Sequence, residues 1–271
     1  MENKKIVYIT AIYGNYELTC KKYKEQTIKS DFICFTNSSE IISNGWIIDT
    51  NPYHLTNKSK LDNNNKLNSI LNNKHSFNIA KYYKQNYYNI PRLKDYDCVV
   101  WLDGTIEIVD ENTSKYLLEN IINYDIIGWS HEYRNGRLIE ETIASDFPRY
   151  TSIKWFNQEQ PFQNIFKQYV HYINNGYNDE YWNEYKLKTK NKNFGIWITC
   201  FVAFNNKKDK VIDFLDLWYE QTLTYSTQDQ ISFPYTCQKL NIIPFTLPNK
   251  EILGNSPHYN TQFYIKHEHG K

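Results

Sequence analysis

At residues 96–105 the chain reads YDCVVWLDGT, and this stretch decides the fold class. Its centre, residues 99–102, is an unbroken apolar run, which predicts a β-strand buried on both faces. Asp103 follows where that strand should leave the core. Gly104 comes next and lets the backbone approach another group closely, because glycine has no side chain. The stretch therefore predicts an α/β sheet with a carboxylate at the end of a central strand.

Short apolar runs that stop at loop-forming residues continue this pattern on both sides of the strand. Further strands are expected at residues 5–12, 31–36, 45–49, 106–109, 125–129 and 194–204. Helices are expected at residues 77–88, 114–123, 162–174 and 208–223. Residues 57–74 indicate a loop or a weak helix, and the chain after Pro244 an irregular tail. The prediction is an α/β fold, with a mixed central sheet flanked by helices.

Composition limits both the number of domains and the class of function. The 271 residues are 41% hydrophobic and contain neither an internal repeat nor a linker rich in Gly, Pro or Ser. One domain over residues 1–271 is expected. It would have a nucleotide-binding half at about 1–130, a half at about 131–245 that contacts the acceptor of a transferred group, and the tail at 246–271. The net charge of +1 argues against a nucleic-acid-binding surface.

The expected location is cytoplasmic, with peripheral contact to a membrane or an assembly site as the alternative. The five cysteines are odd in number and form no Cys-x-x-Cys pair, which favours reduced thiols. The N-terminus reads as a first strand rather than a signal peptide. The longest apolar run, residues 196–204, is far shorter than the roughly 20 residues of a transmembrane helix. The oligomeric state is left open.

Asp103 is the strongest candidate for a ligand-binding residue. Open α/β sheets bind ligands beyond the carboxyl ends of their strands. A carboxylate there can hold Mn²⁺ or Mg²⁺ and so neutralise a diphosphate. Sugar-nucleotide sites often read Asp-x-Asp at this place, whereas here the third position is Thr105, a weaker ligand. The alternative is a turn or helix-cap aspartate.

Other charged residues follow predicted strands or occupy predicted helices. Lys81 and Lys84 lie three apart on a helix and can face one diphosphate, although solvated lysines are the ordinary alternative. After the strand that ends at Trp129 come two candidates for acceptor binding, His131 and Arg134. Glu140 and Glu141 follow, and either is a candidate general base for an acceptor hydroxyl. A charged surface hairpin is the alternative for this segment.

Three further sets of residues complete the predicted site. Asp229 and Gln230 precede an apolar run, where Asp229 either caps a helix or acts on an acceptor sugar. Trp197 is a candidate for stacking on the acceptor, because aromatic faces pack well on sugar rings. Among the late histidines His258, His267 and His269, we expect His258 to be a metal ligand, with a mobile tail as the alternative. No Gly-x-Gly-x-x-Gly, P-loop or Gly-x-Ser-x-Gly spacing occurs.

Taken in order, these segments resemble the glycosyltransferase family of the plant turgor-regulation-defect and mucilage-related proteins. The resemblance covers about residues 6–238. The matching blocks are Thr10-Ala11-Ile12-Tyr13-Gly14-Asn15-Tyr16, Cys34-Phe35-Thr36, Trp101-Leu102-Asp103-Gly104, His131 with Arg134 or Arg137 and Glu140-Glu141, Tyr172 with Gly176 and Trp182, and Trp218 with Asp229-Gln230-Ile231-Ser232-Phe233-Pro234-Tyr235. Gln228 and Asn205 depart from the family, which tends to have arginine at both places.

The resemblance implies a metal-assisted glycosyltransferase with a GT-A-like, Rossmann-like fold. Its donor would be a nucleotide-diphosphate sugar, and its acceptor a glycan, a lipid-linked sugar or a protein. In this reading Thr10, Ala11, Tyr13, Lys81, Lys84 and the Asp103-Gly104-Thr105 turn bind the donor. The alternatives are a metal-dependent nucleotidyltransferase or sugar-nucleotide hydrolase, and a carbohydrate-binding relative without catalysis.

Overall fold

The computed structural model describes residues 4–14, 17–56, 76–146, 154–155, 158–159, 163–248 and 261–269. The strands are β1 (Ile6–Ile12), β2 (Ser30–Thr36), β3 (Ile47–Asp49), β4 (Cys98–Leu102), β5 (Ile106–Ile108), β6 (Ile126–Ser130), β7 (Lys154–Trp155), β8 (Gln158–Glu159), β9 (Trp197–Asn205), β10 (Phe245–Leu247) and β11 (Tyr264–Lys266). The helices are α1 (Tyr53–Thr56), α2 (Ser76–Gln85), α3 (Thr113–Ile121), α4 (Leu138–Ser145), α6 (Ile165–Asn174), α7 (Asn183–Thr189), α8 (Asp209–Thr224) and α9 (Asp229–Lys239). Short 3-10 turns are η2 (Tyr87–Asn89), η3 (Pro91–Leu93) and η4 (Asp179–Trp182).

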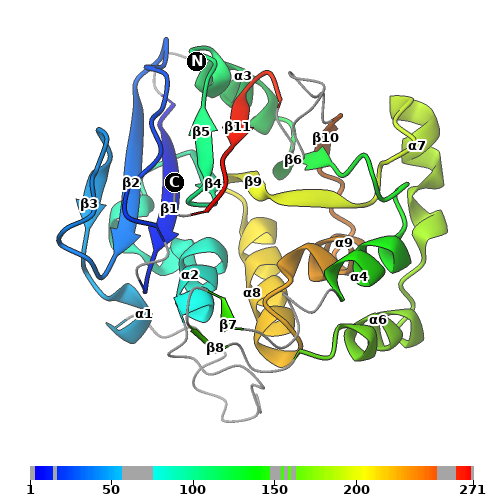
Figure 1. Cartoon of the computed structure of the whole chain (residues 1–271). Coiled ribbons are helices and arrows are strands. Elements are labelled where there is room, and N and C mark those ends of the chain that lie inside the picture. Colours follow the sequence, from blue (N-terminus) through cyan, green and yellow to red (C-terminus); the bar gives the residue numbers. More distant parts are fainter. Residues whose placement is uncertain are drawn as a thin grey trace.

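A seven-stranded sheet runs through the molecule in the order β10-β6-β9-β4-β1-β2-β3 (Figure 1). β9 is antiparallel to both of its neighbours, β4 and β6, and the remaining pairs are parallel. This topology confirms the predicted α/β fold, which has a mixed central sheet flanked by helices. The order β3-β2-β1-β4 is the strand order of a doubly wound nucleotide-binding sheet, and its direction of winding reverses between β1 and β4.

Both faces of the sheet are buried, which explains the unbroken apolar runs of its strands. Alternate residues of β4 point to opposite faces. Val99 and Trp101 pack in one hydrophobic cluster with α2, α8 and α9, whereas Val100 and Leu102 pack in a second cluster with α3, β5 and β11. A third, smaller cluster joins α4, α6 and α9. In Figure 1, α2 and α8 lie on the side of the sheet away from α3.

The strands and helices expected in the first part of the chain are confirmed, with bounds shifted by a few residues. The largest of these shifts is at the C-terminal end of the helix predicted at residues 77–88, since α2 ends at Gln85 and turns η2 and η3 follow it. The predicted loop or weak helix at residues 57–74 lies outside the described residues.

The prediction of an irregular tail after Pro244 is wrong for residues 245–247 and 264–266. β10 extends the central sheet beside β6, and β11 pairs antiparallel with β5. Each of these strands has only three residues, which is too short for an alternating pattern to appear. Their partners are distant in the sequence, and strand preference depends strongly on such tertiary contacts.

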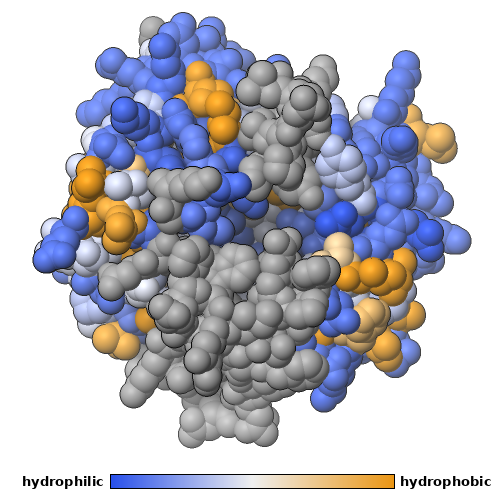
Figure 2. Space-filling view, viewed as in Figure 1, coloured by the Kyte–Doolittle hydropathy of each residue, from blue (hydrophilic) through white to orange (hydrophobic). Residues whose placement is uncertain are grey.

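The described residues on the face that Figure 2 shows are mainly hydrophilic, with hydrophobic residues in separate patches. All five cysteines are buried and carry free thiols. None of the helices in the described part of the chain has the length and apolar character that a membrane crossing requires.

Candidate functional site

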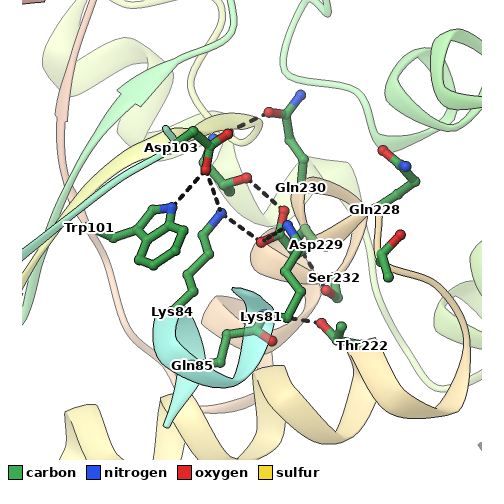
Figure 3. Close-up of polar contacts among 12 residues, drawn as sticks. Lys81, Lys84, Gln85, Trp101, Asp103, Thr222, Gln228, Asp229, Gln230 and Ser232 are labelled. Atoms are coloured by element: carbon green, nitrogen blue, oxygen red, sulfur yellow. Dashed lines mark hydrogen bonds and ion pairs between the residues drawn. The ribbon is translucent and has the colours of Figure 1, made fainter. Parts of the chain in front are cut away.

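Asp103 lies at the carboxyl end of β4, beside the point where the sheet order reverses. Its backbone N–H donates to the Cys200 carbonyl at 2.8 Å, which continues the ladder between β4 and β9. The indole N–H of Trp101 donates to Asp103 Oδ1 at 2.7 Å and orients the carboxylate (Figure 3). The side chain is 38% exposed. Asp103 is thus a fixed carboxylate that a ligand can reach.

Two lysines from α2 meet Asp229, the first residue of α9. Lys81 Nζ lies 2.7 Å and Lys84 Nζ 2.6 Å from the same oxygen, Asp229 Oδ2. Lys84 Nζ also lies 3.9 Å from Asp103 Oδ1, so it links the two carboxylates (Figure 3). We refer to Lys81, Lys84, Asp103 and Asp229 as the charge cluster. The predicted pairing of the two lysines on one face is confirmed, and the group that they both face is Asp229.

Asp229 is held by hydrogen bonds as well as by its two ion pairs. Its Oδ1 accepts a hydrogen bond from the Thr199 hydroxyl at 2.9 Å, and its carbonyl accepts one from the Trp218 indole at 2.9 Å. Burial alone would raise the pKa of this carboxyl, but Lys81 and Lys84 outweigh burial and lower it. Asp229 is therefore ionised, and its carboxylate anchors both ammonium groups. Its side chain does not cap α9, because the N-cap position belongs to Gln228.

The Lys84 ammonium is buried against the rings of two tryptophans. Its side chain is only 1% exposed, and its ammonium lies 5.6 Å from the ring centre of Trp101 and 5.3 Å from that of Trp218. Such positions are favourable for a cation because the face of an indole is negative. Lys81 is 17% exposed and lies nearer the surface. Burial lowers the pKa of Lys81, and the attraction of Asp229 opposes this effect.

Gln230 completes this side of the site. Its side-chain oxygen accepts from the backbone N–H of Thr199 at 3.2 Å, and the hydroxyl of the same threonine donates to Asp229 Oδ1 (Figure 3). The predicted acceptor-binding residue Gln230 therefore lies next to the charge cluster. Thr199 is a site residue that the sequence analysis missed. Its signal is a single hydroxyl within the buried apolar strand β9.

The predicted donor-binding residues of β1 lie inside the sheet. Thr10 and Ala11 are buried strand residues at 2% and 9% exposure. Tyr13 is also buried, and its hydroxyl donates to the Tyr83 hydroxyl at 2.8 Å. A Cβ on Gly104 would lie 3.3 Å from Ile12 Cγ1. The ends of β1 and β4 thus pack closely, and Thr10, Ala11 and Tyr13 are buried in this packing rather than exposed to a ligand.

A second polar group lies at the end of β6. Arg134 Nε donates to Glu141 Oε2 at 2.8 Å, and the Ser145 hydroxyl donates to Glu141 Oε1 at 2.8 Å. His131 Nε2 lies 3.9 Å from Glu141 Oε2. Burial, with a contribution from Arg134, lowers the pKa of His131 to about 3, so this imidazole is neutral at ordinary pH. Three predicted site residues, His131, Arg134 and Glu141, are thus brought together.

Glu140 and Trp197, two other predicted site residues, form hydrogen bonds with residues outside the charge cluster. Glu140 faces outward, where its Oε2 accepts from Asn135 at 2.9 Å and its Oε1 lies 3.6 Å from Arg137. Trp197 is fully buried at the start of β9, and its indole N–H donates to the Thr246 hydroxyl at 2.7 Å. A buried ring offers no face on which a sugar could stack, so the observed position of Trp197 gives no support to acceptor binding.

The described residues do not form a ligand set for Mn²⁺ or Mg²⁺. Thr105 is fully buried, and its hydroxyl has no hydrogen-bond partner among the described residues. Across the described ranges, no three His, Cys, Asp or Glu side chains are grouped so that they could hold a metal ion. The described residues therefore give no support to the predicted Asp103–Thr105 metal site, which stays a prediction. The third predicted ligand, His258, lies outside the described residues.

The other two late histidines lie beside the turn that follows β4. The His267 backbone N–H donates to the Thr105 carbonyl at 2.9 Å, and His267 Nε2 lies 2.7 Å from Glu107 Oε2. His269 Nδ1 lies 2.8 Å from Glu17 Oε1. Residues 261–269 therefore pack against the turn that follows β4 and against Glu17.

Comparison with known proteins finds likenesses of fold only. No protein-family model and no curated protein matches the chain. Among solved structures, the bifunctional glycosyltransferase WbbM in its apo form is 11% identical, with a TM-score of 0.44 over 87% of this chain. The apo form of mouse xyloside xylosyltransferase 1 is 7% identical, with a TM-score of 0.47 over 90% of this chain. The chain spans 38% of the WbbM chain and 84% of the xylosyltransferase. The plant family of the sequence resemblance stays a prediction.

Proposed function

We propose that this protein is a glycosyltransferase that moves a sugar from a nucleotide-diphosphate donor to a hydroxyl of a glycan, lipid-linked or protein acceptor. The observation that carries the proposal is the place of the charge cluster. Asp103 and the lysines behind it lie beside the β1/β4 reversal, where open α/β sheets bind nucleotides.

The residues of the cluster have separate parts in this proposal. Asp103, the most exposed of the four, accepts hydrogen bonds from donor hydroxyls. Lys81, at 17% exposure, meets the negative charge of the leaving diphosphate. Asp229 and Lys84 are buried and fix these two groups in place, so that binding requires little reorganisation.

The acceptor lies on the side of Gln230 in this proposal. The amide of Gln230 is held by Thr199, which also binds Asp229, and amides can both donate to and accept from sugar hydroxyls. The His131, Arg134 and Glu141 group lies at the end of β6, on the same edge of the sheet, and in this proposal Arg134, whose side chain is 19% exposed, is the member that contacts a bound glycan. The base for the acceptor hydroxyl is proposed to be Glu140 or Glu141, because Asp229 is already paired with Lys81 and Lys84.

The first test is thermal unfolding with nucleotides. UDP, GDP, ADP and CDP and their common sugar conjugates are added separately, each with Mn²⁺, with Mg²⁺ and with EDTA. A ligand that binds only the folded state at 100 times its Kd stabilises it by about 2.7 kcal/mol, which is about 5 °C for a chain of this length. We expect one nucleotide family to give such a shift.

Asp103→Ala should abolish the shift, because the variant lacks the exposed carboxylate of the site. Asp95→Ala is the matched control: it removes an exposed aspartate before β4, at the opposite edge of the sheet, and should keep the shift. No shift with any nucleotide, together with binding to glycans, would replace the transferase by a carbohydrate-binding protein. Release of pyrophosphate, or fast donor turnover without acceptor, would favour the nucleotidyltransferase or hydrolase.

A further inference from the structure

The charge cluster is balanced before any ligand binds. It contains two ammonium groups and two carboxylates, and both ammonium groups lie within 2.7 Å of the same Asp229 oxygen. A diphosphate adds negative charge beside Asp103, which is itself a carboxylate. In a partly dehydrated site, added charge of one sign is costly unless an opposite charge accompanies it. A donor diphosphate therefore requires positive charge from outside this cluster.

The C-terminal strand brings a lysine to the same place. In β11, Lys266 pairs with Ile106 of β5, and the next residue, His267, donates its N–H to the Thr105 carbonyl at 2.9 Å. β11 thus ends beside the turn that contains Asp103. Figure 1 shows this strand running from the side of α3 toward the carboxyl ends of β1 and β4.

The direction of the Lys266 side chain follows from the direction of the Tyr264 side chain, two residues earlier in β11. Residues two apart on a strand point to the same face. The Tyr264 ring lies 5.2 Å from that of Phe201 and 5.6 Å from that of Trp129. Lys266 lies about 6.5 Å further along β11 on this face. This step brings Lys266 next to the turn that contains Asp103, because the following residue, His267, donates its N–H to the Thr105 carbonyl.

The ionisation of two buried groups agrees with this position. Burial raises the pKa of the Cys200 thiol to about 11, while Lys266 opposes that rise and Asp103 adds to it. Lys266 also adds to the lowering of the pKa of His131, after burial and Arg134. Lys266 is therefore near both Cys200 and His131, on the face of the sheet opposite to α2.

We infer that Lys266 is the second cation of the diphosphate site, and that the donor diphosphate lies over the end of β4 between Lys81 and Lys266. This inference rests on the proposed function. It assigns to the C-terminal strand a direct part in donor binding, with Lys81 supplied from one face of the sheet and Lys266 from the other.

The test compares nucleoside diphosphates with the matching monophosphates. Dissociation constants are measured by calorimetry for UDP, GDP, ADP and CDP and for UMP, GMP, AMP and CMP, with wild type and Lys266→Met. The diphosphate should bind the variant at least about ten-fold more weakly, the effect of losing one charge-assisted contact. The monophosphate should change less, because it lacks the second phosphate. Lys266→Arg should keep most of the affinity.

Lys207→Met is the matched control. It removes the same charge at the opposite edge of the sheet, where Lys207 Nζ donates to the Lys94 carbonyl. Its affinities should equal those of wild type. Equal diphosphate affinity in Lys266→Met, or equal losses of diphosphate and monophosphate, would overturn the inference and leave the transferase proposal intact. Failure of wild type to bind any nucleotide would overturn both.

Discussion

Substitution of Asp229 by asparagine tests whether the charge cluster is held together as the structure indicates. The variant keeps the size of the side chain but removes the charge that two lysines share at 2.7 Å and 2.6 Å. Lys84 would then be a buried ammonium group without its nearest partner, at 1% exposure. Lys81 would also repel it at short range.

The expected loss of stability follows from this burial. Removing one partner of a buried ion pair costs about 3–5 kcal/mol, because the remaining charge stays desolvated. Unfolding entropy is about 2.1 cal/mol/K per residue. Over 271 residues this makes each kcal/mol worth about 1.8 °C. The unfolding midpoint of Asp229→Asn should therefore fall by about 5–9 °C.

The effect should also depend on pH in a defined direction. Because Lys81 and Lys84 lower the pKa of Asp229 below its ordinary value of 3.8, the carboxylate stabilises the folded state above that pH. This stabilisation is lost as the pH falls through the lowered pKa. The difference between wild type and Asp229→Asn should be constant from pH 5 to 7 and shrink below about pH 4.

Differential scanning calorimetry at several pH values measures both effects. Asp213→Asn is the control, since Asp213 is an exposed aspartate on α8, and its midpoint should change by about 1 °C or less. A fall of less than about 2 °C in Asp229→Asn, equal to that of the control, would refute the argument. It would mean that water already screens the lysines.

Two further predictions concern the neighbours of the cluster. Thr199→Val removes the hydroxyl that donates to Asp229 Oδ1 and should cost about 1.5–3 kcal/mol by chemical denaturation, the usual value of a hydrogen bond to a charged group. The same substitution at Thr189, whose hydroxyl donates to the Tyr185 carbonyl on exposed α7, should cost far less, and equal losses would speak against the Asp229 contact. His131 should stay neutral down to about pH 4, because burial lowers its pKa to about 3. Its folded pKa lies below the ordinary 6.5, so wild type should lose stability as the pH falls below 6.5, whereas His131→Gln should lose less. Titration of the His131 ring protons near pH 6.5 in NMR spectra would contradict this.

The sequence by itself determined the parts of the fold that depend on local pattern. The apolar run of β4 gave the central strand, and it placed Asp103 at the strand end, because a run buried on both faces must end where a charged residue meets solvent. Helical spacing on α2 put Lys81 and Lys84 on one face. These features depend only on residues close together in the chain.

Only the tertiary structure decided what these side chains meet. Asp229 begins a helix far along the chain, and its contact with both lysines depends on how α9 packs against β9 and α8. The burial that makes Lys84 a fixed charge comes from Trp101 and Trp218, which belong to different elements. β11 was missed because three residues give no periodic signal and its pairing partner lies far away in sequence. Long-range packing sets burial, and burial sets the strength of charge interactions, so the chemistry of the site could not be obtained from local pattern alone.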